Sequence, residues 1–345
     1  MPDSGTLRVI DFGQVTPLRS QTLWHAVGYG VSAGEPPTLS FARPSAPYVC
    51  LGYHRDLAEV DHDYCRAHDL PVYRRMVGGG PVYLDQRQLF FQICVPAGDV
   101  SPSRRDALAG LLAPVVTAFE AVGIPARLDP AGEICLGEAK ICGHGAGQIE
   151  NAVVVCGNLI EAFDHDRAAA ILAMPDPAQR DQTAALMRRY VAATPADPGA
   201  FAAALTGAYA TALGRDPRPG HLSAGELAAV TELDELFTSP DWLAGPARTS
   251  GRPAAPGAAG RGVKVRGGVW TFAASSGGAR IAASVIAGRL EQVSLTAPAM
   301  NGQARAAERA LVGLPVAGAA DALRQFGEPG RQLAAALAGA EGRVL

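Results

Sequence analysis

The sequence predicts a larger α/β body followed by a small α+β domain. Apolar runs typical of strands alternate with helical patterns through the first two thirds of the chain. Residues 245–260 then form a Pro-, Ala- and Gly-rich stretch of the kind that makes flexible linkers. Three strand patterns and two amphipathic stretches follow it. We therefore expect a body at 1–215, a connecting helix and linker at 216–260, and a C-terminal domain at 261–345.

Each element rests on a local pattern of apolar residues bounded by glycines and prolines. In the body, such patterns predict strands on both sides of the glycines at 78–80 and at 7–12, 38–43, 47–53, 89–95, 124–128, 132–136, 139–142 and 152–160. Helical spacing predicts helices at 17–33, 56–70, 103–122, much of 165–213 and 222–243. The C-terminal strands are expected at 262–274, 280–287 and 290–296, and the helices at 303–313 and 318–340. This order favours a mixed sheet flanked by helices in the body.

The composition favours a folded protein of the reducing cytoplasm. The chain has 345 residues, of which 48% are hydrophobic and 18% charged, so apolar burial can offset chain entropy. A net charge of −3 argues against a general nucleic-acid binder, and no apolar run reaches the roughly 20 residues that span a bilayer. The N-terminus lacks the pattern of a secretory signal, and the six cysteines form no CxxC pair. We expect a cytoplasmic monomer without nucleic-acid, membrane or protein-bound metal partners.

Lysine usage singles out one residue. Of the 30 basic residues, only Lys140 and Lys264 are lysines. The lysine ammonium is a compact charge with three rotatable hydrogen-bond donors, whereas the arginine guanidinium is rigid and planar. In a chain that otherwise uses arginine, a lysine can therefore mark a site that a planar guanidinium does not fit. Lys140 stands among Ile, Cys and Gly in a strand-like hairpin, where its charge can hold a phosphate or a developing negative charge. The alternatives are chance and an edge-strand lysine; Lys264 is interpreted as solvated.

A glycine loop is the second candidate. Gly78, Gly79 and Gly80 follow Arg74 and Arg75 directly. Consecutive glycines let the backbone approach a ligand closely, and two arginines can neutralise a carboxylate or a phosphate. No Gly-Lys-Ser/Thr follows, so the loop is not a Walker A motif. The alternative is a glycine hairpin with surface arginines.

Two cysteines near Lys140 are candidate nucleophiles. Cys142 or Cys156 could carry an acyl group if the basic surroundings lowered its pKa. His144 follows Cys142 by two residues and keeps a thiol–imidazole pair open. Buried structural cysteine is the more common case.

These motifs together resemble the lipoate–protein ligase family. Residues 72–85 (VYRRMVGGGPVYLD) are similar to the family's Arg-Arg-x-x-Gly-Gly-Gly motif, and residues 48–55 to the segment before it. Residues 137–143 (GEAKICG) resemble its lysine hairpin, and residues 156–160 (CGNLI) its third, weaker signature. The sequence departs from the family by placing Pro81 where Ala is common, Leu84 and Cys156 where His is common, and Glu133-Ile134 where Asn-Asp is common.

The resemblance implies a biotin/lipoate ligase-type catalytic domain with an accessory C-terminal domain. It further implies that lipoate is activated by ATP, with Mg²⁺, to lipoyl-AMP and transferred to a lysine of an acceptor domain. Such acceptors are 2-oxoacid dehydrogenase E2 or glycine cleavage H proteins. Lys140 would be catalytic and would bind the carboxylate and the α-phosphate, and Arg74 would face the anionic end. The expected substrate-binding and nucleotide-binding residues are Arg74, Arg75, Gly78, Gly79, Gly80, Val82, Tyr83, Asp85, Ile141, Gly143 and Gly157.

Two other functions remain open at this point. An ATP-independent octanoyl or lipoyl transferase would work through a thioester on Cys142 or Cys156, although the accessory domain favours an adenylating ligase. A non-catalytic lipoate-binding protein would bind without releasing pyrophosphate. A biotin ligase is disfavoured because its glycine loop differs in form.

Overall fold

The structure is a computed structural model that describes residues 5–245, 262–297, 300 and 302–344. These residues fold as two compact units. The first contains the described residues up to Arg167 and from Ala192 to 245, and the second contains Ala168–Val191 and the described residues from 262 onward. Apart from its first position, the predicted linker at 245–260 lies outside the described residues.

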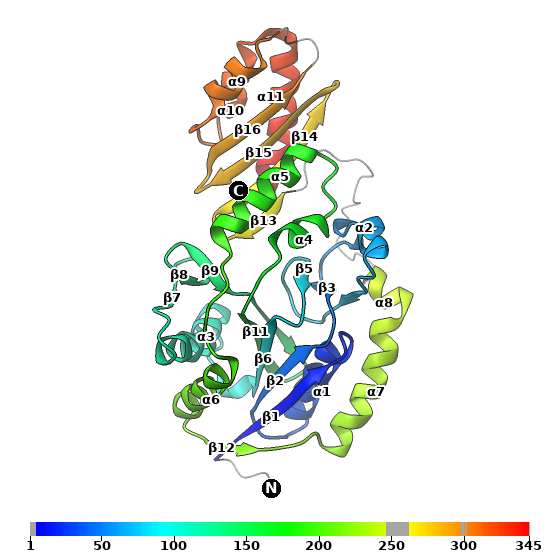
Figure 1. Cartoon of the computed structure of the whole chain (residues 1–345), viewed down its shortest axis with the longest axis vertical. Coiled ribbons are helices and arrows are strands. Elements are labelled where there is room, and N and C mark those ends of the chain that lie inside the picture. The colour runs from blue at the N-terminus through cyan, green and yellow to red at the C-terminus, as the bar shows by residue number, and fades with distance from the viewer. Residues whose placement is uncertain (1–4, 246–261, 298–299, 301, 345) are drawn as a thin grey trace. The chain divides into compact units, whose positions relative to one another are not determined.

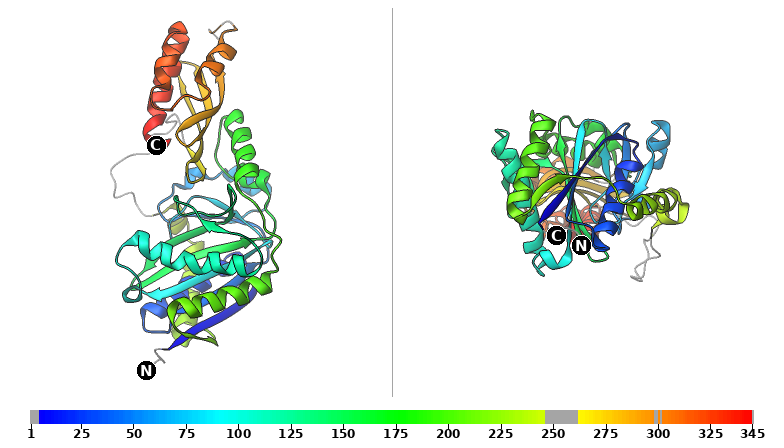
Figure 2. Two further views of the ribbon diagram at one scale, coloured as in Figure 1. Left: turned by 90° about the vertical axis from the view of Figure 1, so that its left-hand side faces the viewer. Right: turned by 90° about the horizontal axis from the view of Figure 1, so that it is seen from below.

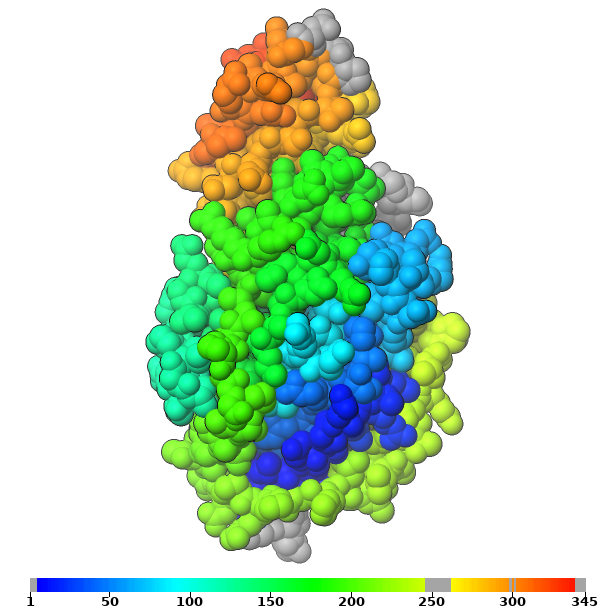
Figure 3. Space-filling view, viewed as in Figure 1, coloured from blue at the N-terminus to red at the C-terminus, as the bar shows by residue number. Residues whose placement is uncertain are grey.

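A six-stranded mixed sheet forms the centre of the first unit, and the prediction of a mixed sheet flanked by helices is confirmed (Figure 1). In spatial order its strands are β10 (His144–Ile149), β11 (Ala152–Ile160), β6 (Gln88–Pro96), β2 (Thr38–Pro44), β1 (Thr6–Val15) and β12 (Asp216–Pro219). β1 is parallel to both of its neighbours, whereas the other neighbouring pairs are antiparallel. Figure 3 shows the blue N-terminal segment beside the green-yellow chain that contains β12, in agreement with this pairing.

Helices cover both faces of this sheet (Figures 1 and 2). One face carries α1 (Arg19–Ser32), which packs against α7 (Ala224–Thr238), followed by α8 (Pro240–Ala244); the other carries α3 (Arg104–Ala121) and α6 (Pro198–Leu213). Because side chains alternate along a strand, β11 supplies Val154 to the core beside α1 and Val155 to the core beside α3 and α6. Burial on both faces explains why residues 152–160 form a nearly continuous apolar run.

Capping residues set the ends of these helices. Ser103 Oγ accepts a hydrogen bond from the amide of Asp106 at the start of α3. Helix α7 begins with a capping box, in which Ser223 and Glu226 each accept a hydrogen bond from the other's backbone amide.

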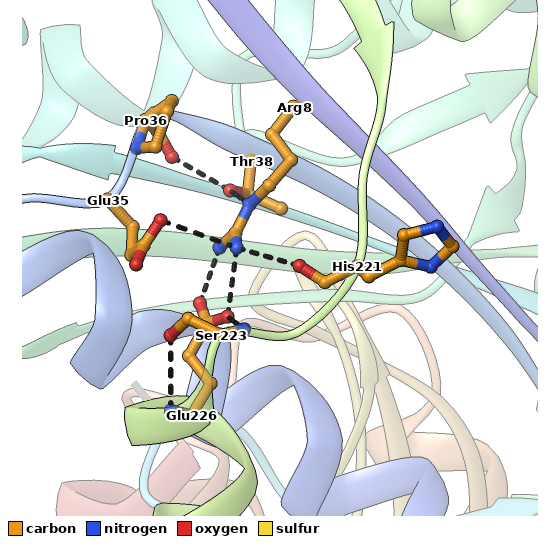
Figure 4. A network of polar contacts seen from close by, with 7 residues as sticks. All are labelled: Arg8, Glu35, Pro36, Thr38, His221, Ser223 and Glu226. Atoms are coloured by element: carbon orange, nitrogen blue, oxygen red, sulfur yellow. Dashed lines mark hydrogen bonds and ion pairs between the residues drawn. The ribbon is translucent and has the colours of Figure 1, made fainter. Parts of the chain in front are cut away.

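A buried ion pair ties α7 to the sheet (Figure 4). The Arg8 guanidinium donates to both carboxylate oxygens of Glu226, and Glu226 is 1% exposed. Arg8 also donates to Thr38 Oγ1 over 2.9 Å and to the carbonyl of His221 over 3.1 Å. The space for these groups depends on Gly30, since a Cβ there would collide with the Glu226 carboxylate. A charge pair that is buried in this way destabilises the fold strongly when one partner is removed.

Two small three-stranded sheets carry the motifs that the sequence singles out. In the first, β3 (Tyr48–Leu51) lies between β4 (Val72–Arg74) and β5 (Val82–Leu84). In the second, β8 (Ile134–Leu136) lies between β7 (Arg127–Leu128) and β9 (Ala139–Cys142). Short helical segments are found at α2 (His62–Ala67), Leu57–Glu59 and Ala97–Asp99.

The second unit is a four-stranded antiparallel sheet with helices, as the predicted α+β domain requires. Its strands are β13 (Val263–Arg266), β14 (Val269–Ser276), β15 (Ala279–Ile286) and β16 (Arg289–Thr296), and its helices are α4 (His165–Ala170, shared with the first unit), α5 (Pro177–Tyr190), α9 (Ala304–Leu311), α10 (Ala319–Arg324) and α11 (Gly327–Val344). Alternate residues of β14 face opposite helices: Phe272 joins the core beside α11, and Thr271 Oγ1 hydrogen-bonds Thr183 Oγ1 of α5 over 2.7 Å.

The two units do not coincide with the predicted domain boundaries. Residues 168–191 belong to the second unit because α5 covers the sheet face opposite α11, whereas the sequence placed them in the body. Helices α7 and α8, predicted as a connection, belong to the first unit. Lys264 is exposed, as expected, and lies 6.0 Å from the centre of the Trp270 ring. Within the described ranges, no helix combines the length and apolar character needed to cross a membrane.

Candidate active site

The loop that joins β4 to β5 contains the three glycines, and Arg75 holds it from inside. The buried Arg75 guanidinium donates to the carbonyls of Gly78 over 2.8 Å, Gly80 over 3.1 Å and Cys50 over 3.0 Å. Gly79 has a φ of +106°, a conformation that favours glycine. A Cβ at Gly52 would collide with the Gly79 carbonyl. The shape of the loop therefore depends on the close approach of the Gly52 and Gly79 backbones and on the hydrogen bonds from the Arg75 guanidinium.

Arg74 is not placed to face an anionic ligand, in contrast to the expectation from the resemblance. Its guanidinium is fully buried, and its hydrogen bonds to the described residues all go to backbone carbonyls. These carbonyls belong to Gly52, Tyr53, Arg55, Trp242 and Leu243. The Trp242 indole donates back to the Arg74 carbonyl over 2.9 Å. Burial lowers the pKa of Arg74, and the residue joins α8 to the segment after β3.

Lys140 lies on β9 and forms an ion pair with Glu133. The Lys140 Nζ is 2.5 Å from Glu133 Oε2, and the two side chains are only 18% and 8% exposed. Asp129 Oδ1 accepts hydrogen bonds from the amides of Ala131 and Glu133 and so holds the turn before β8. The neighbouring Ile141 is fully buried in the core. The structure therefore presents a mostly buried ammonium group on a rigid hairpin.

His144, at the start of β10, belongs to the same cluster of charged and titratable groups. Burial and the charge of Lys140 lower its pKa to about 4, while Glu133 opposes this shift. Its Nδ1 atom is buried and makes no hydrogen bond in the part of the chain that the structure describes. The sequence identified His144 only as a possible partner of Cys142. We refer to Glu133, Lys140 and His144 as the β9–β10 cluster.

Alternate glycines of the chain at β10 bring the two motifs together. A Cβ at Gly145 would lie 3.3 Å from the Gly78 carbonyl, and a Cβ at Gly147 would lie 2.7 Å from Val77 Cγ1. Since residues two apart share a face of a strand, β10 presents a surface without side chains to the glycine loop. The glycine loop and the segment that follows Lys140 are therefore direct neighbours.

A chain of amides positions the strand end that follows Lys140. The Gly143 amide donates to Asn158 Oδ1 over 2.7 Å, and Asn158 Nδ2 donates to Gln88 Oε1 over 2.7 Å. Gln88 approaches Asp85 Oδ1 at 3.5 Å, and Asp85 accepts a hydrogen bond from the Arg87 amide. Sequence reasoning missed Asn158 and Gln88. The sequence does carry a signal for Asn158, which is a polar residue inside the apolar run 152–160. A buried amide requires hydrogen-bond partners, so such a residue indicates a polar contact inside the fold.

The remaining predicted residues have varied surroundings. Val82 is exposed, whereas Tyr83 is buried and its hydroxyl accepts a 3.4 Å hydrogen bond from Arg167. Gly157 serves close packing, since a Cβ there would collide with the Phe91 ring. Leu84, one of the departures, packs beside the buried Tyr48.

Comparison with known proteins identifies the family. The model of the lipoyl protein ligase A/B catalytic domain matches residues 21–193, which is half of the chain. The chain belongs to this family. The family assignment from the sequence is thereby confirmed.

Relatives in this family include both ligases and transferases. Lipoate–protein ligase 1 of Staphylococcus aureus is 30% identical over 35% of this chain and 36% of its own length. The chain therefore spans about a third of that relative. An octanoyltransferase, LipM of Moorella thermoacetica, is 26% identical over 69% of this chain and 97% of its own.

Solved structures show the same fold. A bipartite lipoate protein ligase from Thermoplasma acidophilum, described together with its E2 lipoyl domain, superposes with a TM-score of 0.62 at 24% identity, over 72% of this chain and 99% of its own. A lipoate–protein ligase A bound to ATP gives 0.58 at 23% identity, over 70% and 99%.

The candidate cysteines are in surroundings that keep their thiols protonated. Burial raises the pKa of Cys142 to about 12 and also raises that of Cys156. Burial likewise raises the pKa values of Cys50, Cys65 and Cys94. The thiolate is the nucleophilic form, so these environments oppose covalent acyl transfer through sulfur.

The described part of the chain contains no group of three or more His, Cys, Asp or Glu side chains arranged to hold a metal ion. Glu133 is a carboxylate beside the proposed phosphate site, but its oxygen pairs with Lys140. These residues do not form a protein-built Mg²⁺ site.

Proposed function

We propose that this protein is an ATP-dependent lipoate–protein ligase. It activates lipoate as lipoyl-AMP and transfers the lipoyl group to a lysine of an acceptor domain. The observation that carries the proposal is the mostly buried Lys140 ammonium on the strand before β10, which packs against the glycine loop, in a member of the lipoyl protein ligase A/B family.

Lys140 supplies fixed positive charge where the first reaction develops negative charge. When the carboxylate attacks the α-phosphate, pyrophosphate leaves and charge increases on the phosphoryl oxygens. A cation held in a water-poor site stabilises that arrangement more than the ground state. The compact ammonium can turn its three donors toward the carboxylate and the phosphate, which a planar guanidinium cannot do at the same site.

Glu133 holds Lys140 in the absence of substrate. An anionic substrate must compete with the Glu133 carboxylate for the ammonium, since both are bound by the same charge. The ion pair orients the lysine side chain despite its low exposure.

The glycine loop provides a backbone wall for the acyl chain and the nucleotide. Gly78 to Gly80 have no side chains to exclude a ligand, the glycine face of β10 lets the loop pack closely against that strand, and Arg75 fixes the loop from its buried side. Arg74 and Arg75 thus support the site from within the fold instead of contacting the ligand.

The bound molecules of similar proteins support this assignment. Structures of similar fold are described with ATP, with lipoic acid and, in the Thermoplasma system, with an E2 lipoyl domain. For this chain we propose ATP with Mg²⁺, lipoate and a lipoyl-acceptor domain as the corresponding substrates.

An ATP-independent octanoyltransferase is the second candidate. The match to LipM over 97% of that enzyme favours it. The raised pKa values of Cys142 and Cys156 oppose a thioester mechanism.

The test is pyrophosphate release from ATP with lipoate in the absence of acceptor. We expect release in the wild-type protein and its loss in Lys140→Arg, with His221→Ala, an exposed residue of the same unit, as the matched control. Acyl transfer from an octanoyl carrier without ATP, abolished by Cys142→Ser or Cys156→Ser, would establish the second candidate instead.

A further inference from the structure

Gly143 is the point at which the chain crosses from one sheet to another. It is the single residue between β9, which carries Lys140 in the small β7–β8–β9 sheet, and β10, which begins at His144 in the six-stranded sheet. Gly143 thus joins the two halves of the β9–β10 cluster. Since β10 packs against the glycine loop, the backbone angle at Gly143 sets where the Lys140 strand lies relative to that loop.

Asn158 holds both polar main-chain groups of Gly143. The Asn158 amide donates to the Gly143 carbonyl over 3.1 Å, and the side-chain oxygen Oδ1 of Asn158 accepts a hydrogen bond from the Gly143 amide over 2.7 Å. Asn158 is 7% exposed and lies on β11, an inner strand of the six-stranded sheet. A Cβ at residue 143 would lie 3.2 Å from that Oδ1 atom. One side chain therefore fixes the crossing between the two sheets.

The orientation of the Asn158 side chain is determined from both of its ends. A carboxylate only accepts hydrogen bonds, so Gln88 directs its Nε2 atom to Asp85 Oδ1, 3.5 Å away. The Gln88 Oε1 atom then accepts from Asn158 Nδ2 over 2.7 Å. This leaves Asn158 Oδ1 for the Gly143 amide, which can only donate. Asp85, Gly143 and Asn158 come from the three separate segments that carry the family resemblance.

A small change in the angle at Gly143 moves Lys140 far. Three residues of a strand span about 10 Å, so a rotation of about 10° at Gly143 would shift the Lys140 Cα by about 1.7 Å. A misplacement of about 1 Å can reduce a rate by about 10²-fold. Lys140 has two other partners, Glu133 at its side chain and the Ala192 amide, which donates to its carbonyl over 2.9 Å. Neither belongs to the six-stranded sheet, whereas Asn158 does.

We propose that Asn158 is a positioning residue for adenylate formation, which holds the Lys140 strand at the angle that brings the ammonium to the lipoate carboxylate and the α-phosphate of ATP. This inference rests on the proposed function. Asn158 acts through the Gly143 main chain and needs no contact with either substrate. Its loss should therefore weaken the binding of the carboxylate and slow the release of pyrophosphate, but should leave the binding of the uncharged acyl chain unchanged.

The test compares lipoate with lipoamide, the neutral amide of the same acyl chain, in the full-length Asn158→Leu variant. Leucine has a similar volume but accepts no hydrogen bond from the Gly143 amide. Lipoate binding, measured by calorimetry, should weaken about tenfold, as expected for the loss of a hydrogen bond to a charged group. Lipoamide binding should stay within about twofold of the wild type. The rate constant of pyrophosphate release at saturating lipoate and ATP should fall about 10²-fold.

A double-mutant cycle shows whether the effect passes through Lys140. Lipoate binding is already weakened in Lys140→Ala, so the addition of Asn158→Leu should change it by less than about twofold. Thr22→Val is the matched control, since it removes another buried hydrogen bond of the same unit, from Thr22 Oγ1 to Asp234 Oδ1 over 2.7 Å. It should change neither the affinities nor the rate. Asn158→Ala serves if the leucine variant does not fold, because it removes the same hydrogen bond without adding volume.

Three outcomes would overturn the proposal. They are an equal weakening of lipoate and lipoamide binding, a further loss of lipoate affinity in the Lys140→Ala background, and a wild-type rate of pyrophosphate release in the Asn158 variant. If the wild-type protein itself releases no pyrophosphate, it is the proposed function that fails.

Discussion

A buried neutral histidine should make the first unit sensitive to acid. His25, in α1, is fully buried, and its Nδ1 hydrogen-bonds the Gln21 carbonyl over 2.7 Å. Its Nε2 accepts a 3.0 Å hydrogen bond from the amide of Met76, the residue after Arg75. Burial lowers the pKa of His25 from 6.5 to about 3. A protonated ring could not accept the hydrogen bond from the Met76 amide. Protonation of His25 at low pH therefore destabilises the folded state, and it does so at the chain segment next to the glycine loop.

The magnitude follows from the pKa shift. Below pH 6.5 the unfolded chain binds a proton at His25 that the folded chain does not bind until about pH 3. Stability from this residue is therefore complete above pH 6.5 and is lost as the pH falls toward 3, at about 1.4 kcal/mol per pH unit. Between pH 7.5 and pH 5 the loss is about 2 kcal/mol.

Denaturant unfolding of His25→Gln measures this contribution. The glutamine can still accept the Met76 hydrogen bond but does not titrate. The signal is tryptophan fluorescence, since Trp24 stacks on His25 with ring centres 3.5 Å apart. We expect the free energy of unfolding to change between pH 7.5 and pH 5 by about 2 kcal/mol less in the variant than in the wild type. His221→Ala is the control, and an unchanged pH dependence in His25→Gln would refute the reasoning.

Three other predictions follow from single contacts. Gly79→Val should abolish lipoate binding, measured by calorimetry, because φ is +106° and the new Cβ would collide with the Arg75 guanidinium; Gly98→Ala, outside the glycine loop, where a Cβ meets nothing within 4 Å, should bind normally, and equal affinities in the two variants would show that the loop is only a turn. Glu226→Leu should lower the free energy of unfolding by about 3–5 kcal/mol, since it leaves the buried Arg8 with only the partly exposed Glu35 carboxylate, 3.7 Å away, as a charged partner among the described residues, and a second change, Arg8→Met, should recover most of the loss; no loss in the single variant would contradict the role of the Arg8–Glu226 ion pair. Cys142→Ser and Cys156→Ser should retain ligation, measured by acceptor mass, because raised pKa values keep both thiols protonated; a folded but inactive variant would support the thioester route.

The sequence predicted the layers of the fold because apolar periodicity reports burial directly. The uninterrupted run at 152–160 indicated a strand buried on both faces, and β11 is such a strand. The assignment of residues 168–191 to a domain could not be read from periodicity. The amphipathic pattern of α5 shows that one face of the helix is buried, but it does not show which sheet covers that face. Only the tertiary contacts assign α5 to the second unit.

The sequence singled out candidate residues, whereas the contacts of those residues came only from the structure. The sequence pointed to the glycine loop and to Lys140, and the structure packs β10, the strand that follows the Lys140 strand, against that loop. It could not show that Arg74 and Arg75 bind backbone carbonyls, because those partners include residues as distant in sequence as Leu243. The hydrogen-bond partners of Asn158, and the lack of one at His144 Nδ1 among the described residues, could likewise not be read from the sequence, since hydrogen bonding depends on the folded chain.

Intact mass measurement of an apo lipoyl domain tests the central claim most directly. The domain is incubated with lipoate and either the wild-type protein or Lys140→Arg, with and without Mg-ATP. We expect a lipoyl mass increase only with the wild-type protein and only when ATP is present. Modification without ATP, or undiminished modification by Lys140→Arg, would contradict it.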